Sequence, residues 1–153
     1  MASMPIAADC QKIEKAVRIS APPFAVWAAL TRPDLMAQWM TDEELSVAFD
    51  ARAGAPIVIH GTLHGMPFEN HGTVQIFEPE KAFAYNYWST LSIARLPDHP
   101  DNYTSVRFDL TSCDDGTLLA LTLSDFPDIS IPQHANFYWG TTLSILKAFV
   151  ERQ

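Results

Sequence analysis

Three histidines in one short region are the side chains of this chain best suited to metal chemistry. His60 and His64 lie four residues apart, so on a strand they face the same side, and His71 follows beside Glu69 across an expected hairpin. Imidazole nitrogens together with a carboxylate can bind zinc. Their phase, however, is opposite to that of the apolar residues, which places them on a solvated outer face. We therefore predict no metal site and, because the chain has no glycine-rich phosphate loop, no cofactor.

Acid–base chemistry would have to come from loops. Residues Thr90–Tyr103 form a long segment that contains two prolines, and loops of that length in a compact domain are often lids or binding loops. An enzyme would need Asp98 or His99 from this loop, or Asp125 and Asp128 farther along, as its general acid or base. Enzyme activity therefore stays open, but we favour ligand binding, because these candidate acids and bases lie on loops and not inside the predicted pocket.

In four predicted strands apolar and polar residues alternate, which assigns their side chains to an inner and an outer face of the sheet. No carboxylate, lysine or cysteine falls on the inward phase, so a deep pocket would lack both a nucleophile with its base and a general acid. The inward residues are Asn70, Gly72, Val74, Ile76, Phe83, Tyr85, Tyr87, Val106, Phe108, Leu110, Leu119, Leu121 and Leu123.

The polar groups on this apolar wall are few. Tyr85 and Tyr87 supply phenols, with the Asn70 amide and Tyr138 of the last helix as further candidates. Such a lining suits a ligand with an apolar body and one or two polar groups. The alternative is that both tyrosines pack in the core and bond their hydroxyls to backbone or water. His134 could touch a ligand, although a solvent position at a helix start is the more ordinary place for it. The predicted ligand-binding residues are Phe83, Tyr85, Tyr87, Phe108, Leu119, Leu121, Trp139 and Leu143.

The elements that must position these side chains can be read from periodicity and turn residues. Two short helices follow the first strand: prolines open the first, with Val26, Trp27 and Leu30 on one face, and Pro33 starts the second, which carries Trp39. A long helix is predicted from Pro132 to Arg152. The predicted strands are Ile13–Ile19, Leu45–Phe49, Ile57–Leu63, Phe68–Phe77, Ala82–Trp88, Ser105–Thr111 and Thr117–Leu123.

The order of elements predicts an α+β fold. Six consecutive strands joined by short turns favour an antiparallel sheet, because parallel pairing would need crossovers. Seven strands about 4.8 Å apart make a sheet roughly 33 Å wide, whereas a helix with its side chains is only about 10–12 Å across. We therefore expect a curved sheet wrapped around the C-terminal helix, with a pocket left beside it.

These motifs resemble the family of homologues of the activator of the ninety-kilodalton heat-shock protein ATPase. The matching stretches are Val26–Pro33 with Trp39, Gly72–Val74, Glu78-Pro79, Gly116–Leu119, and Trp139, Leu143, Leu146, Lys147 and Glu151 of the last helix, where Tyr138 replaces the family's glycine. The family belongs to the START-like (SRPBCC) superfamily of helix-grip ligand-binding domains. The resemblance implies that fold, with a ligand-holding cavity.

Composition narrows the class of partner. The chain has 153 residues, of which 48% are hydrophobic and 18% charged, and its net charge is -8. This acidic balance argues against nucleic acid or an anionic membrane as a partner. We find no membrane span or signal peptide, and the two cysteines share no motif. We expect residues 1–10 to be a tail, residues 11–153 to be one domain, and the location to be cytoplasmic; a homodimer stays open.

Three functions are compatible with these observations. The leading prediction is a binding module that encloses a hydrophobic ligand such as a lipid, a polyketide or an aromatic metabolite. Superfamily relatives that act as polyketide cyclases or dehydratases suggest an enzyme as the alternative. The family's namesake suggests a chaperone-associated interaction domain as a third.

Overall fold

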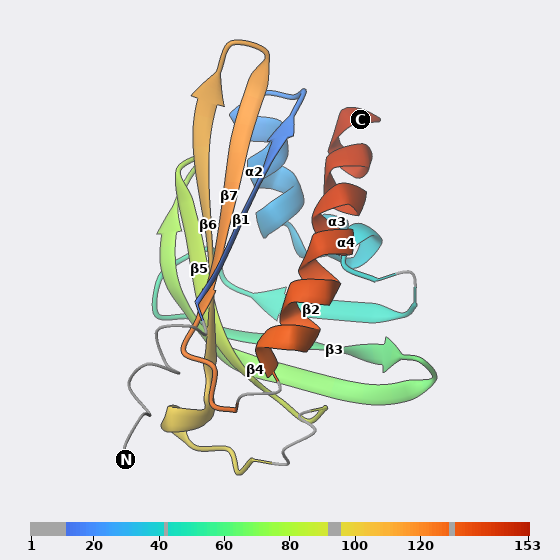
Figure 1. Ribbon diagram of the computed structural model, residues 1–153, viewed down its shortest axis with the longest axis vertical. Helices are drawn as coiled ribbons and strands as arrows, with labels where there is room; N and C mark the ends of the chain where they lie inside the picture. The colour runs from blue at the N-terminus through green and yellow to red at the C-terminus, as the bar shows by residue number, and fades with distance from the viewer. Residues whose placement is uncertain (1–11, 42, 92–95, 129–130) are drawn as a thin grey trace.

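The computed structural model describes residues 12–41, 43–91, 96–128 and 131–153, and the predicted tail of residues 1–10 lies outside them. Figure 1 shows a curved sheet with one long helix across it. The elements are β1 (Ile13–Ile19), α2 (Pro23–Thr31), α3 (Pro33–Trp39), β2 (Leu45–Phe49), β3 (Pro56–Leu63), β4 (Met66–Glu78), β5 (Ala82–Ser89), the 3-10 turn η1 (Pro100–Asn102), β6 (Thr104–Cys113), β7 (Gly116–Ser124) and α4 (Ile131–Glu151).

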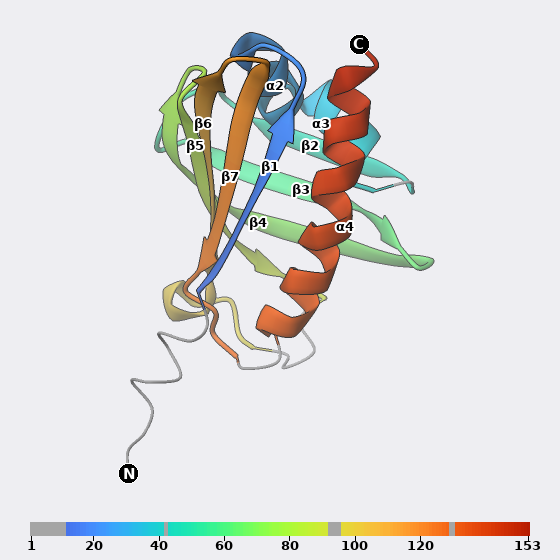
Figure 2. The same ribbon diagram turned by 45° about the horizontal axis from the view of Figure 1, so that its top comes forward.

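The sheet has seven strands in the order β1-β7-β6-β5-β4-β3-β2, and each neighbouring pair is antiparallel. Consecutive strands from β2 to β7 are therefore adjacent, as short turns require, and β1 joins the edge beside β7. In Figures 1 and 2 the strands β2, β3 and β4 run across the direction of β6, β7 and β1, so the sheet curves, and α4 lies on its concave side. The predicted α+β architecture is confirmed.

Two prolines start the short helices after β1. Pro23 and Pro33 each occupy the first turn, where a missing N–H leaves no helical hydrogen bond unmade. Arg32 lies between the helices in an extended conformation, with φ -94° and ψ 117°, and ends α2 while it opens α3. The indole Nε1 of Trp39 donates to the backbone oxygen of Ala29 at 2.8 Å. This buried bond fixes the angle between the two helices.

The C-terminal helix is held to the sheet by apolar and polar contacts. Leu143, Leu146 and Phe149 are buried on one side of α4. Near its end, the Glu151 carboxylate accepts hydrogen bonds from Lys147 Nζ at 2.5 Å and from the Ser20 backbone N–H at 2.7 Å. The last turn of α4 is thereby tied to the junction between β1 and α2. Among the described residues, no helix is long and apolar enough to cross a membrane.

The inner face of the sheet forms the core, with one change of phase in β4. Val74 pairs with Tyr85, but the register then shifts at a bulge and Phe77 pairs with Phe83. One extra residue reverses the alternation of side chains beyond it. Phe77 therefore reaches the core, where its ring lies 6.0 Å from that of Phe83. The prediction that Ile76 points inward is wrong for this reason.

Candidate ligand-binding cavity

A cavity of about 330 Å³ lies between the first half of α4 and the inner face of the sheet. Strands β2 to β5 and the first residue of β6 form its wall, and the segments that follow β5, α3 and β7 form its rim. Its described lining residues are Met40, Thr41, Leu45, Ile59, Leu63, Phe68, Asn70, Tyr85, Tyr87, Trp88, Ser89, Leu91, Leu96, Asn102, Thr104, Pro127, Ile131, His134, Ala135, Tyr138 and Trp139.

The cavity occupies the end of the concave face that α2 and α3 do not cover. In both ribbon views α2 lies toward the C-terminal end of α4, whereas η1 lies toward its N-terminal end. Val26, Leu30 and Trp39 from the short helices are buried in the core. Trp39 lies 6.4 Å from Trp139, ring centroid to ring centroid, and Trp139 also lines the cavity. Tightly packed tryptophans therefore close one end of the space.

The sequence-predicted site residues divide into two groups. Tyr85, Tyr87 and Trp139 line the cavity. The other five are buried in the packed core and are not among the described lining residues: Phe83, Phe108, Leu119, Leu121 and Leu143. Strand phase gives the face of a residue but not its position along the strand. The four strand residues lie at the end of the sheet that the helices cover, and Leu143 lies on α4. Their contact with a ligand stays a prediction that this geometry does not support.

Several residues that line the cavity were not predicted from the sequence. Leu45, Ile59 and Phe68 come from β2, β3 and the first part of β4. The alternation of residues in β2 and β3 could have identified Leu45 and Ile59, because both lie on the face of this strand pair opposite to Ser46 and His60. Rim residues such as Leu96 carry no such signal, since their position depends on the path of a loop.

Two phenols inside the cavity are held in their neutral form. Burial raises the pKa of Tyr85 above its ordinary value, and the neighbouring hydroxyls of Tyr87 and Tyr138 raise it further. Burial raises the pKa of Tyr87 to about 12. Neither of these two hydroxyls has a hydrogen-bond partner among the described residues, whereas Tyr138 donates to the Met40 backbone oxygen at 2.5 Å. Tyr85 and Tyr87 can therefore offer neutral hydrogen bonds to a bound molecule.

The loop of residues 90–103 borders the rim, and its described parts are residues 90–91 and 96–103. Leu96 and Asn102 from this loop line the cavity. Trp88 Nε1 donates to the Leu96 backbone oxygen at 3.1 Å, and Asn102 Nδ2 donates to the Pro97 oxygen at 3.0 Å. The described part of this segment therefore lies at the cavity, as the expectation of a lid or a binding loop requires.

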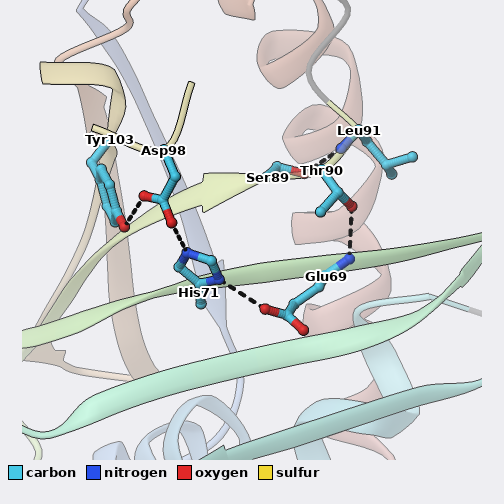
Figure 3. A network of polar contacts seen from close by, with 7 residues as sticks. All are labelled: Glu69, His71, Ser89, Thr90, Leu91, Asp98 and Tyr103. Atoms are coloured by element: carbon cyan, nitrogen blue, oxygen red, sulfur yellow. Dashed lines mark hydrogen bonds and ion pairs between the residues drawn. The ribbon is translucent and has the colours of Figure 1, made fainter. Parts of the chain in front are cut away.

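The same loop is tethered on the outer face of the sheet, as Figure 3 shows. His71 Nδ1 lies 2.8 Å from Glu69 Oε2, and His71 Nε2 lies 2.7 Å from Asp98 Oδ2. Tyr103 donates its hydroxyl to Asp98 Oδ1 at 2.6 Å. The hydrogen bond to Glu69 and then that to Asp98 raise the pKa of His71, while Tyr103 and His71 lower the pKa of Asp98. We name these four residues the outer tether.

The outer tether does not face the cavity. Asn70 points inward to the cavity, so its neighbour His71 lies on the opposite face of β4, as the sequence predicts. Among the described residues, no group of three or more histidine, cysteine, aspartate or glutamate side chains is arranged to hold a metal ion.

The four residues considered for acid–base chemistry are not brought together in the cavity. His99 Nδ1 accepts from the Asp101 backbone N–H at 3.2 Å, and Asp125 Oδ2 accepts from the Ser105 hydroxyl at 2.6 Å. Neither these two nor Asp98 and Asp128 is among the described residues that line the cavity. The arrangement therefore offers an apolar chamber with neutral polar groups.

Comparisons with known proteins agree with this architecture. The model of a protein family described as "Activator of Hsp90 ATPase homolog 1-like protein" matches residues 20–151. A comparison with curated proteins gave no match. A solved structure from Cytophaga hutchinsonii is 30% identical, covers 92% of this chain and 94% of its own, and superposes with a TM-score of 0.76.

Two further solved structures agree in fold. A protein from Chromobacterium violaceum is 23% identical, with 93% of this chain and 98% of that chain covered and a TM-score of 0.78. The solution structure of the Aha1 dimer from Colwellia psychrerythraea is 21% identical, with 92% and 96% covered and a TM-score of 0.71.

Proposed function

Because the chain belongs to the family of Activator of Hsp90 ATPase homolog 1-like proteins, with the helix-grip fold of the START-like superfamily, we propose that it binds a hydrophobic small molecule. The ligand would lie between the first half of α4 and the inner face of the sheet. The observation that carries the proposal is the cavity itself, since its volume of about 330 Å³ falls in the range of small-molecule sites.

The chemistry of the lining supports binding more than catalysis. The described lining residues include no aspartate, glutamate, lysine, arginine or cysteine. His134, on the exposed side of α4 at the mouth, is the one imidazole among them. General acid–base and nucleophilic catalysis both need a titratable group within reach of the reacting atom. Burial of apolar ligand surface is, in contrast, favourable by roughly 25 cal/mol per Å².

Filling the cavity with a side chain tests the proposal. Ala135 lines the cavity from α4, and the next residue, Asn136, is exposed and outside the described lining. We expect the neutral fluorescent probe N-phenyl-1-naphthylamine to bind the wild-type protein. Ala135→Trp should weaken this binding by roughly tenfold or more, because the indole takes the space of the probe, while the matched control Asn136→Trp should bind as the wild type does.

The measurement is a fluorescence titration of each folded protein, with folding checked by circular dichroism. Probe binding that is equal in Ala135→Trp and Asn136→Trp would place the probe elsewhere and contradict the proposal. Absence of binding to the wild type would contradict it as well. A cytoplasmic location remains a prediction, and a homodimer stays open.

A further inference from the structure

The polar side chains around the cavity differ in whether they already have a partner. Ser89 Oγ accepts from the Leu91 backbone N–H at 3.1 Å, and Thr41 Oγ1 accepts from the Glu43 backbone N–H at 3.2 Å. Asn102, Trp88 and Tyr138 are bonded as described above. Among the described residues of the lining, five other polar side chains have no hydrogen-bond partner: Asn70, Tyr85, Tyr87, Thr104 and His134. Five polar groups of the lining are thus left for a ligand.

Asn70 is the most telling of these groups. Its side-chain oxygen is buried and has no partner in the described structure. Buried polar atoms are nearly always hydrogen-bonded in native proteins, so each exception calls for an explanation. A half-turn of the amide exchanges its oxygen with its NH₂ group, and no hydrogen bond holds it against that turn. The side chain can therefore present either a donor or an acceptor to the cavity.

Three of these groups, Asn70, Tyr85 and Tyr87, lie close together on neighbouring strands. Asn70 of β4 pairs with Ser89 of β5, and Tyr87 and Tyr85 follow on the same face at two-residue intervals. The two tyrosine rings lie 6.4 Å apart, centroid to centroid. Between Asn70 and Val74 this face of β4 carries only Gly72, and on the other side of β5 the cross-strand partner of Tyr87 is Thr104 of β6, which also lines the cavity. The free amide and the two free phenols therefore border one part of the cavity wall.

The charges available to a ligand there are few. Apart from the His134 imidazole at the mouth, the described lining has no basic side chain to pair with a carboxylate, and it has no carboxylate to pair with an ammonium group. An ionised group moved from water into such a site loses its hydration without a counter-charge. A hydroxyl group is neutral and both donates and accepts, so it matches an amide next to a phenol.

We propose that the ligand is an uncharged aromatic or polycyclic molecule whose hydroxyl group binds Asn70 and Tyr87. This inference rests on the proposed function. Its apolar body then fills the space toward Ile59, Ala135 and Trp139. The same geometry discriminates against compact carboxylates and amines. A ligand bound in the opposite orientation, with a charged group at the mouth beside His134, would leave the Asn70 side chain without a hydrogen-bond partner.

Three matched probes test this assignment at neutral pH: 2-naphthol, naphthalene and 2-naphthoate. Each is measured by its displacement of N-phenyl-1-naphthylamine from the wild-type protein. We expect 2-naphthol to bind roughly three- to tenfold more tightly than naphthalene, as one net hydrogen bond allows, and about tenfold or more tightly than 2-naphthoate. Asn70→Leu should remove the preference for 2-naphthol over naphthalene, whereas the exposed control Asn136→Leu should keep it.

The outcomes separate this inference from the proposed function. If N-phenyl-1-naphthylamine binds but 2-naphthoate binds as well as 2-naphthol, the neutral-ligand assignment is overturned and the cavity stands. A preference for 2-naphthol that survives in folded Asn70→Leu overturns the role of Asn70. If Asn70→Leu fails to fold, the wild-type ranking of the three probes still decides the ligand class. Absence of binding by every probe overturns both proposals.

Discussion

Among single residues, those that matter most for the proposed binding are buried polar side chains without a hydrogen-bond partner. Tyr85 and Tyr87 lie on the inward phase of β5, where burial keeps both phenols protonated through the physiological range. Their hydroxyls have no partner among the described residues, so water or a ligand must satisfy them. A group of this kind contributes specificity to binding and little to folding.

Removing either hydroxyl should therefore weaken binding more than stability. Tyr85→Phe and Tyr87→Phe each delete one neutral hydrogen bond, a change worth about 0.5–1.5 kcal/mol in affinity. We expect this loss for Tyr87→Phe in a titration with 2-naphthol, with a midpoint of urea unfolding close to that of the wild type. Unchanged affinity in both variants would leave the tyrosines as packing residues.

Trp27 should show the opposite behaviour. Its ring packs edge-on against Phe77 and Phe83, at centroid distances of 5.2 Å and 6.3 Å, and it is not among the described lining residues. Trp27→Ala should lower the free energy of unfolding by about 3 kcal/mol, the low end for a truncated tryptophan because this ring is only partly buried. The folded fraction should bind N-phenyl-1-naphthylamine normally. Weakened binding with unchanged stability would reverse this assignment.

At the scale of elements, the outer tether joins strand β4 to the loop that closes the cavity. His71 comes from the strand, whereas Asp98 and Tyr103 come from residues 96–103. The imidazole lies between two carboxylates, so its protonated form makes two charge-assisted bonds. The position of the loop is therefore linked to the charge of His71.

This linkage predicts how stability changes with pH. The pKa of His71 in the folded protein is raised above 6.5, mainly by the hydrogen bond to Glu69. The tether's contribution is then fully present below the unfolded value of about 6.5 and is lost as pH rises through the raised pKa. We expect the free energy of unfolding of the wild type to exceed that of His71→Gln at pH 6, and this difference to shrink toward pH 9.

Urea titrations at each pH measure the effect, and Glu14→Gln serves as a control, since this exposed carboxylate lies on β1 away from the tether. A difference between wild type and His71→Gln that stays constant or grows with rising pH would show that the imidazole is not charged in the tether.

The elements were largely predictable from the sequence, because prolines, turn residues and alternation are local signals. The positions of α2 and α3 followed from Pro23 and Pro33, and the outward face of His71 followed from period two. The bulge in β4 was not predictable in this way. Whether Ile76 or Phe77 faces the core depends on which backbone groups pair with β5, and that register is a non-local property.

At the scale of the whole molecule, the concave face of the sheet has a packed end and a hollow end. The short helices and the second half of α4 fill the first with buried side chains such as Leu30 and Leu146. The second is closed by the first half of α4 and by loops. The existence of a pocket followed from the widths of sheet and helix, but its place did not, because it depends on where α2 and α3 come to rest.

This division explains the residues that sequence reasoning placed in the site. Phe83 and Phe108 stack at 6.4 Å with an interplanar angle of 7°, which leaves no room between them for a ligand. Tyr85, two residues farther along β5, already reaches the cavity. A shift of two residues along one strand thus separates core from candidate site.

The most direct measurement is a nuclear Overhauser experiment on the protein saturated with N-phenyl-1-naphthylamine. It reports contacts between probe protons and individual methyl groups. We predict contacts to the methyl groups of Leu45, Ile59 and Ala135, which line the cavity, and none to those of Leu119 and Leu121 in the packed core. Contacts confined to the exposed Ile145 on the outer side of α4, or to Leu119 and Leu121, would contradict a ligand enclosed in this cavity.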